Sequence, residues 1–255
     1  KSNPVIKNRN LKIIFSITLV GVMGVATITP VLPDIAHELD IKKGNIGLLI
    51  TVFAFPGIFL SPVIGVFADR FGRKAILVPA LMLFAVAGTS CFFVENFRGL
   101  LIMRFFQGIG AAAIGTLNIT LIGDIFEGNR RAEAMGYNSS VLSSATALYP
   151  AIGGGLAVFG WNMPFLLPAV AFFVALFVLF KLDNPEPKKQ ENLLDYFKGA
   201  LGKMNSCLII MLFLLTFSTF LLLFGSILTY VPESSALRFP CFPFPQGLLP
   251  HNWAA

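Results

Sequence analysis

Charged residues are scarce in this sequence. Asp, Glu, Lys and Arg make up 13% of the 255 residues, whereas a soluble globular domain carries about 25%. Hydrophobic residues make up 56% of the chain, and its mean hydropathy is +0.78. This composition argues against an ordinary soluble domain and favours a membrane protein.

Cysteine and histidine are also rare. Cys91, Cys207 and Cys241 lie far apart and form no C-x-x-C pair, and the two histidines, His37 and His251, are isolated. The first two cysteines lie in or beside apolar runs, where a free cysteine behaves as a small hydrophobic side chain. The sequence therefore predicts no metal site, no redox pair and no cofactor.

Motifs of membrane-embedded enzymes are missing as well, since the chain has no H-E-x-x-H, no G-x-S-x-G and no convergent pair of acids. The net charge of +6 is compatible with nucleic-acid binding. However, the basic residues are scattered between apolar runs and form no stripe with interleaved aromatic residues. We therefore expect neither an enzyme nor a nucleic-acid-binding protein.

Long apolar runs, by contrast, are abundant. A helix needs about 17 to 25 apolar residues to cross a bilayer, and only Arg104 places a full charge clearly inside a run of that length. Apolar residues occur all round each run, as expected where lipid or other helices cover every face. The sequence predicts an all-α membrane protein with seven transmembrane helices. The runs are residues 13–33, 46–68, 75–94, 100–123, 135–158, 164–180 and 207–231.

The basic residues of the loops predict the orientation, because cytoplasmic loops carry an excess of Lys and Arg. We expect a multi-pass protein of the cell membrane with a cytoplasmic N-terminus, since this places most of the basic residues inside. The outer segments then hold Lys42, Lys43, Arg98 and Arg238. The cytoplasmic segments hold Lys1, Lys7, Arg9, Lys12, Arg70, Arg73, Lys74, Arg130, Arg131, Lys181, Lys188, Lys189, Lys198 and Lys203.

The runs and the segments between them suggest four parts. We expect a six-helix transmembrane bundle over residues 1–181, a cytoplasmic linker over 182–206 and a seventh transmembrane helix over 207–231. Residues 232–255 are rich in proline and contain no run of spanning length, which predicts an irregular tail.

The loop between the second and third runs, GVFADRFGRK at residues 65–74, gathers four charged residues in a chain that has few. Its three basic residues fit an anchor on the cytoplasmic side, but an anchor needs no carboxylate, so Asp69 is unexplained. Gly65 allows the close approach of another helix, and Gly72 allows a tight turn.

This loop matches in full the pattern G-x-x-x-D-R-x-G-R-K, and the chain resembles the major facilitator superfamily, which carries that pattern in the same loop. The resemblance implies the N-terminal six-helix bundle of a major facilitator fold plus a seventh helix, with the C-terminal half absent. It also implies that the aspartate engages a helix N-terminus of the other half, which attracts a carboxylate by about 0.3–2 kcal/mol. The matching residues are Gly65, Asp69, Arg70, Gly72, Arg73 and Lys74.

Arg104 lies about one turn into the fourth run, and a charge that reaches the bilayer centre costs about 2.5–3.5 kcal/mol. One reading is that its side chain snorkels to the outer headgroups, which would lower that cost. Its surroundings, RFFQGIGAA, resemble instead the family motif R-x-x-Q-G-x-G-A, which implies a role of the arginine in proton coupling. The matching residues are Arg104, Gln107, Gly108 and Gly110.

The fifth run carries SSVLSSATALYPAIGGG, which resembles the G-x-x-x-G-P-x-x-G-G signature of drug/proton antiporters, although Ala145 and Tyr149 replace two glycines. Proline removes a backbone hydrogen bond, and glycines permit bending and close packing. The Ser and Thr residues at 139–146 either line an aqueous path or bond their own backbone. Asn118, Thr120 and Thr116 of the fourth run are further polar residues that could face a central cavity. The signature residues retained are Pro150, Gly153 and Gly154.

The resemblance implies a secondary active transporter that exports small amphipathic compounds by alternating access, with proton antiport as the coupling. The expected partners are a small-molecule substrate, protons and the lipid bilayer. The alternative is a truncated, non-transporting membrane fragment, because members of this family have two halves. A second half-transporter chain would then be needed to complete it.

Overall fold

The computed structural model describes residues 5–42 and 45–182, together with a few residues between 211 and 222. The predicted linker beyond Leu182, nearly all of the predicted seventh span and the predicted tail lie outside the described residues.

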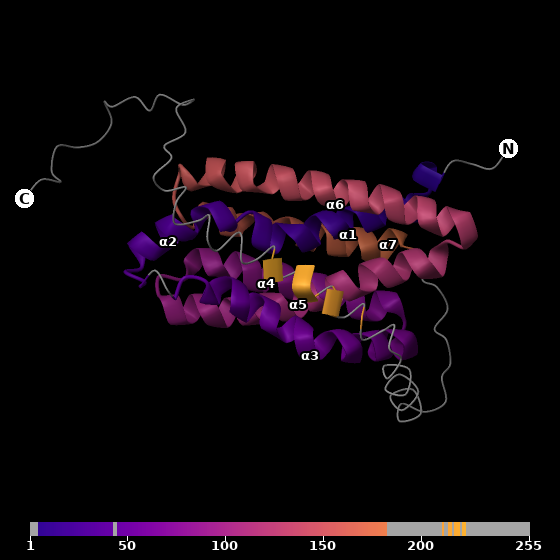
Figure 1. Ribbon diagram of the computed structural model, residues 1–255, viewed down its shortest axis with the longest axis horizontal. Helices are drawn as coiled ribbons and strands as arrows, with labels where there is room; N and C mark the ends of the chain where they lie inside the picture. Colours follow the sequence, from indigo (N-terminus) through magenta and orange to yellow (C-terminus); the bar gives the residue numbers. More distant parts are fainter. Residues whose placement is uncertain are drawn as a thin grey trace, which may run out of the picture. The chain divides into compact units, whose positions relative to one another are not determined.

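Residues 5–42 and 45–182 contain α-helices and short 3₁₀ turns and no strand (Figure 1). The turns are η1 (Val5–Lys7), η2 (Thr29–Val31), η3 (Cys91–Phe93) and η4 (Met163–Ala169). The helices are α1 (Arg9–Ala26), α2 (Leu32–Glu38), α3 (Leu48–Phe71), α4 (Arg73–Ser90), α5 (Phe97–Ile125), α6 (Gly128–Ala157) and α7 (Val170–Lys181).

The first six predicted spans are all helical. Five segments are both long and apolar enough to cross a membrane, and they correspond to spans one to four and six: Arg9–Glu38, Leu48–Phe71, Arg73–Phe93, Phe97–Ile125 and Met163–Lys181. Span five corresponds to α6, which has 30 residues and is long enough, but α6 is not among the segments that are apolar enough. The protein is therefore an all-α membrane protein, with one helix more polar than the others.

Local sequence explains where several helices begin and end. The side chain of Asn8 accepts a hydrogen bond from the Asn10 amide at 2.9 Å, and the side chain of Asn96 accepts one from the Gly99 amide at 2.6 Å. Such caps satisfy amide groups that the first helical turn leaves free. Gly72 separates α3 from α4 with φ 92° and ψ 144°, a conformation that residues with a Cβ rarely adopt. The tight turn that Gly72 allows is present.

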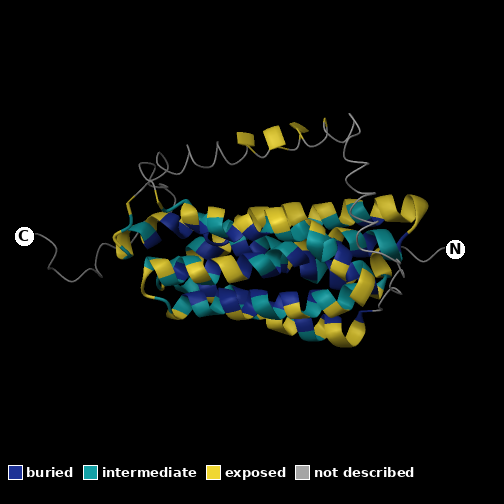
Figure 2. Cartoon of the chain, turned by 90° about the horizontal axis from the view of Figure 1, so that it is seen from below, coloured by how far each residue is buried: buried dark blue, intermediate teal, exposed yellow. Residues whose placement is uncertain are grey.

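Helix α5 contacts both α3 and α4, while α1 packs against α5 and α6, and α7 packs against α4. Large aliphatic and aromatic side chains fill the space between α1, α4, α5 and α7, and exposed residues lie on the outward faces (Figure 2). Many exposed residues on α3 and α7 are apolar, including Phe55, Ile58, Phe173 and Phe180, as expected of faces that meet lipid. Helix α6 differs, because its exposed residues include several Ser, Thr, Asn and charged side chains.

Candidate functional site

The turn between α3 and α4 brings three charged side chains together. Arg73 Nη2 lies 2.5 Å from Asp69 Oδ1, and Arg73 Nε lies 2.9 Å from Asp124 Oδ2. Asp69 is in the last turn of α3, Arg73 begins α4 and Asp124 is near the end of α5. The three side chains are only 12–22% exposed, so solvent screens their attraction less than at an open surface. Arg73 thus links the ends of α3 and α5 to the start of α4.

The other residues of this turn have different surroundings. The Lys74 ammonium donates a hydrogen bond to the Leu182 carbonyl at 3.2 Å, directly after the end of α7, where carbonyl groups lack helical partners. The Arg70 guanidinium lies 5.7 Å from the centre of the exposed Phe71 ring. A Cβ added at Gly65 would meet no described atom within 4 Å. The close helix approach that Gly65 allows is therefore not used within the described part of the chain.

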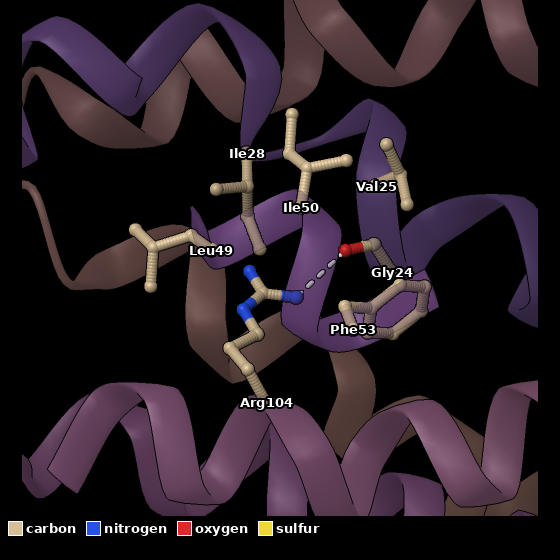
Figure 3. A pocket seen from close by; sticks show the side chains of 7 residues that line it. All are labelled: Gly24, Val25, Ile28, Leu49, Ile50, Phe53 and Arg104. Carbon is tan, nitrogen blue, oxygen red and sulfur yellow. Dashed lines mark hydrogen bonds between the residues drawn. The ribbon is translucent and has the colours of Figure 1, made fainter. Parts of the chain in front are cut away.

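Arg104 lies inside the bundle and is 2% exposed. Its Nη1 donates to the Gly24 carbonyl of α1 at 2.8 Å (Figure 3). The same Nη1 donates to Gln107 Oε1 at 3.0 Å. Its guanidinium carbon lies 5.7 Å from the Phe53 ring centre and 4.9 Å from the Phe165 ring centre. The burial of this side chain against α1, α3 and η4 argues against the snorkelling alternative, in which the guanidinium would reach solvent at the membrane surface.

The electrostatic surroundings of Arg104 are unusual for a buried charge. No ion pair of the described residues includes it, and its Nε and the Nε2 of Gln107 are both buried without a hydrogen-bond partner. The adjoining cavity, lined by Gly24 and Phe53 among others, holds about 10 Å³, roughly the space of one water molecule. Buried charges are normally paired. This site instead contains two N–H donors, Arg104 Nε and Gln107 Nε2, that no described acceptor binds.

The glycines that follow Arg104 allow neighbouring helices to approach closely. A Cβ at Gly108 would clash with the Phe53 carbonyl of α3, and one at Gly110 would lie 2.7 Å from the Ala80 carbonyl of α4. Neither position has room for a side chain. These two glycines therefore fit α5 against α3 and α4, and they hold Phe53 beside Arg104.

The residues of the α6 signature differ in how closely they pack against other helices. A Cβ at Gly153 would clash with the Thr27 carbonyl, which fixes close packing against the end of α1, whereas Gly154 faces open space among the described residues. Pro150 lies inside α6. Of the hydroxyl groups at 139–146, those of Ser140 and Thr146 bond the backbone of their own helix, and both residues are exposed.

A polar chain that the motifs do not include links α1, α5 and α6. Asn118 Nδ2 donates to Thr18 Oγ1 at 2.6 Å, and Thr18 Oγ1 lies 2.5 Å from Asn138 Oδ1 and 3.0 Å from the Ile14 carbonyl. A cavity of about 360 Å³ lies beside this chain and is lined by all three of its side chains. Sequence reasoning named Asn118 but missed Thr18 and Asn138, although a polar residue near the middle of an apolar run is the signal that marks such positions.

Comparison with known proteins identifies the family. The model of the Major Facilitator Superfamily matches residues 14–249, which is most of the chain. The chain belongs to the major facilitator superfamily. It is 32% identical over 188 residues to multidrug resistance protein 1 of Bacillus subtilis (strain 168), an alignment that covers 72% of this chain and 48% of the relative. It is 30% identical over 182 residues to the quinolone resistance protein NorA of Staphylococcus aureus, covering 71% and 47%.

Solved structures of the superfamily share the fold. A bacterial homologue of the human lysosomal transporter Spinster, in an inward-facing and unoccupied conformation, matches with a TM-score of 0.66 at 21% identity, over 76% of this chain and 47% of that one. The human organic anion transporter MFSD10 matches with a TM-score of 0.60 at 19% identity, over 73% and 49%. The chain thus spans about half the length of the superfamily members it matches.

Proposed function

We propose that this chain is one half of a secondary active transporter that exports small amphipathic compounds by alternating access, with proton antiport as the coupling. The observation that carries the proposal is Arg104, a cation with 2% exposure in a membrane-spanning helix. Such residues are costly and mark transport pathways. The names of two relatives, a multidrug and a quinolone resistance protein, favour export of drug-like compounds.

The turn between α3 and α4 supports a gate in this proposal. Arg73 binds both Asp69 and Asp124, so the group holds one positive and two negative charges and has negative charge left over. A helix N-terminus from the other half would attract that charge, and partly buried contacts of this kind contribute up to about 2 kcal/mol. This is enough to change the ratio of two conformations by more than tenfold. With the N-terminus in the cytoplasm, the gate lies on the cytoplasmic side of the cell membrane.

Arg104 supports the coupling. Its charge disfavours a second positive charge nearby, since two unit charges 4 Å apart repel by about 4 kcal/mol at an effective dielectric constant of 20. A bound proton and a cationic substrate close to Arg104 would each be repelled by its charge and by one another, so the site disfavours holding both at once, as antiport requires. The free donors of Arg104 and Gln107 are suited to an acceptor that arrives during the cycle.

The second candidate function is a membrane fragment that does not transport on its own. The observation that favours it is the coverage of the relatives, 48% and 47% of their lengths. Alternating access moves two bundles against each other, so a chain that meets no second bundle would bind ligands but not move them.

Proteoliposomes separate the two functions. In one arm they contain this chain alone, and in the other a version completed to the length of its relatives. A pH gradient is imposed, and uptake of the fluorescent quinolone norfloxacin is followed. We expect gradient-dependent uptake in the second arm and none in the first. If the completed version shows no uptake with norfloxacin or with the amphipathic cation ethidium, the transporter proposal is wrong.

A further inference from the structure

We propose that Phe165 is a positioning residue for the transport that Arg104 serves: the face of its ring holds the Arg104 guanidinium against the Gly24 carbonyl of α1, in place of a carboxylate. Phe165 belongs to η4 and to none of the sequence motifs. Its role in transport rests on the function proposed above, whereas its hold on Arg104 can be tested without transport.

Local sequence explains why η4 is not a part of α7. Pro168 has no backbone N–H, and in an α-helix its ring would clash with the Pro164 carbonyl four residues earlier. Met163–Ala169 instead wind as a 3₁₀ turn of 7 residues, which is longer than such runs usually are. Side chains three residues apart lie above one another in this geometry. Phe165 and Pro168 therefore share one face of η4.

That face of η4 meets α5 at two matched positions. Phe165 lies against Arg104, with 4.9 Å between its ring centre and the guanidinium carbon. Pro168 lies near Gln107, because Pro168 Cβ and Gln107 Nε2 are each 2.5 Å from the position that a Cβ on Gly88 of α4 would take. Arg104 and Gln107 are also three residues apart, and they are hydrogen-bonded to each other. A pair of residues on η4 thus packs against the pair on α5 that belongs to the motif.

The η4 turn is held at both ends, and this keeps the Phe165 ring in place. Asn162, directly before η4, donates from its Nδ2 to the Phe92 carbonyl at 3.3 Å. The Trp161 ring packs against the Phe165 ring at an angle of 84°. At the other end, Pro168 packs against α4. A side chain whose rotamer is fixed by packing is suited to position a second one.

An aromatic ring holds Arg104 in a different way from a carboxylate. The face of the ring attracts a cation although the ring carries no net charge. Arg104 is 2% exposed and Phe165 is 0% exposed, so solvent weakens this attraction little. Within the described ranges, no ion pair includes Arg104. The positive charge is therefore stabilised without being cancelled, and it can still repel a second cation during transport.

Phe53 of α3 is the other ring beside Arg104, and its surroundings differ. Its centre lies 5.7 Å from the guanidinium carbon, and it lines the small cavity together with Gly24 (Figure 3). Phe165 is closer to the guanidinium and does not line that cavity. Phe165 is therefore the ring whose contact with Arg104 is not open to the cavity.

A series of fluorinated phenylalanines at position 165 tests the hold with little change of shape. Each fluorine withdraws electron density from the face of the ring and weakens its attraction for a cation. Phenylalanine and its 4-fluoro, 3,5-difluoro and 3,4,5-trifluoro derivatives are incorporated at an amber codon, and thermal unfolding of the full chain is followed in nanodiscs. We expect the melting temperature to fall with each fluorine, by about 5 °C for the trifluoro ring. A constant melting temperature along the series would overturn the proposal. If the trifluoro protein does not fold, the other three members give the slope.

Two controls separate the cation–π contact from packing. Phe126 is 4% exposed and lies beyond the end of α5 that is far from Arg104, and no described cation lies over its ring. The same series at Phe126 should leave the melting temperature unchanged. The series at position 165 should also have no effect in Arg104→Met, because the charge is gone. A slope at position 165 that persists in Arg104→Met, or an equal slope at Phe126, would show that the fluorines act on packing and would overturn the proposal.

Norfloxacin uptake under a pH gradient tests the role in transport, with the version completed to the length of its relatives. With trifluorophenylalanine at position 165, uptake normalised to folded protein should fall about tenfold, since a desolvated cation–π contact is worth at least that factor. Uptake equal to that of the unmodified version would overturn the role of Phe165 in transport. If the unmodified version shows no uptake, the proposed function fails instead, and the melting series still decides whether Phe165 holds Arg104.

Discussion

Arg73 and Arg104 are both arginines of motifs in membrane-spanning helices, yet they are held in different ways. Arg73 binds two carboxylates at the ends of α3 and α5. Arg104 binds a backbone carbonyl and an amide oxygen, between two aromatic rings. Removal of Arg73 leaves two like charges facing each other, whereas removal of Arg104 leaves no charge behind. We therefore propose that Arg73 contributes to folding and gating, and that Arg104 is retained for transport.

The largest effect is expected for transport after Arg104→Met, which keeps much of the side-chain volume. Uptake by the completed transporter should fall about 10- to 100-fold, the usual size of a coupling between two sites. Norfloxacin uptake under a pH gradient is the measurement, normalised to folded protein. Arg98→Ala is the control, because Arg98 is an exposed residue of the same helix and its loss should change uptake less than twofold.

Arg73→Met should lower the free energy of unfolding by about 2 kcal/mol, between the values for exposed and fully buried ion pairs. The cost arises because Asp69 and Asp124 lose their shared partner. Thermal unfolding in nanodiscs measures it. The double variant Arg73→Met/Asp124→Asn removes one of the two like charges and should recover about half of the loss. Absence of any recovery would show that the two carboxylates do not interact.

Lys74→Met should have a smaller effect, about 0.5–1 kcal/mol, because it removes one charge-assisted contact at the end of a helix. Hydrogen exchange in the last turn of α7 should rise, since Lys74 donates to the Leu182 carbonyl. Exchange at the start of α1 serves as the internal reference. Unchanged exchange at the end of α7 would mean that this cap does not hold the helix end.

The smallest effect concerns salt. Raising the ionic strength from 0.1 to 1 M shortens the Debye length from about 10 to 3 Å, and this weakens partly exposed ion pairs more than buried contacts. The melting temperature of Arg73→Met should therefore depend less on salt than that of the wild type, whereas Arg104→Met should keep the salt dependence of the wild type. Equal salt responses in all three proteins would remove the electrostatic difference between the two arginines.

Much of this arrangement follows from the sequence, because bilayer thickness determines the length of each helix and the motifs mark residues with special roles. The helices of the first six spans, the turn at Gly72 and the identity of Arg104 as an unusual residue were all predictable. The pairing of Arg73 with Asp124 was not, since Asp124 is 51 residues away and only packing of α4 beside α5 brings the two together. The same holds for Asn118 and Thr18, 100 residues apart. At Gly65 the sequence allows a close helix contact that the described residues do not make.

The central claim, that Arg104 serves transport and not folding, is tested most directly by thermal unfolding of Arg104→Met and Arg73→Met side by side in the same nanodiscs. Arg104→Met removes the cost of burying a charge that has no ion-pair partner among the described residues. This gain offsets the two hydrogen bonds lost at the Gly24 carbonyl and Gln107 Oε1. The account predicts that Arg104→Met melts at or above the wild-type temperature, while Arg73→Met melts several degrees below it. A melting temperature of Arg104→Met below that of Arg73→Met would contradict the claim.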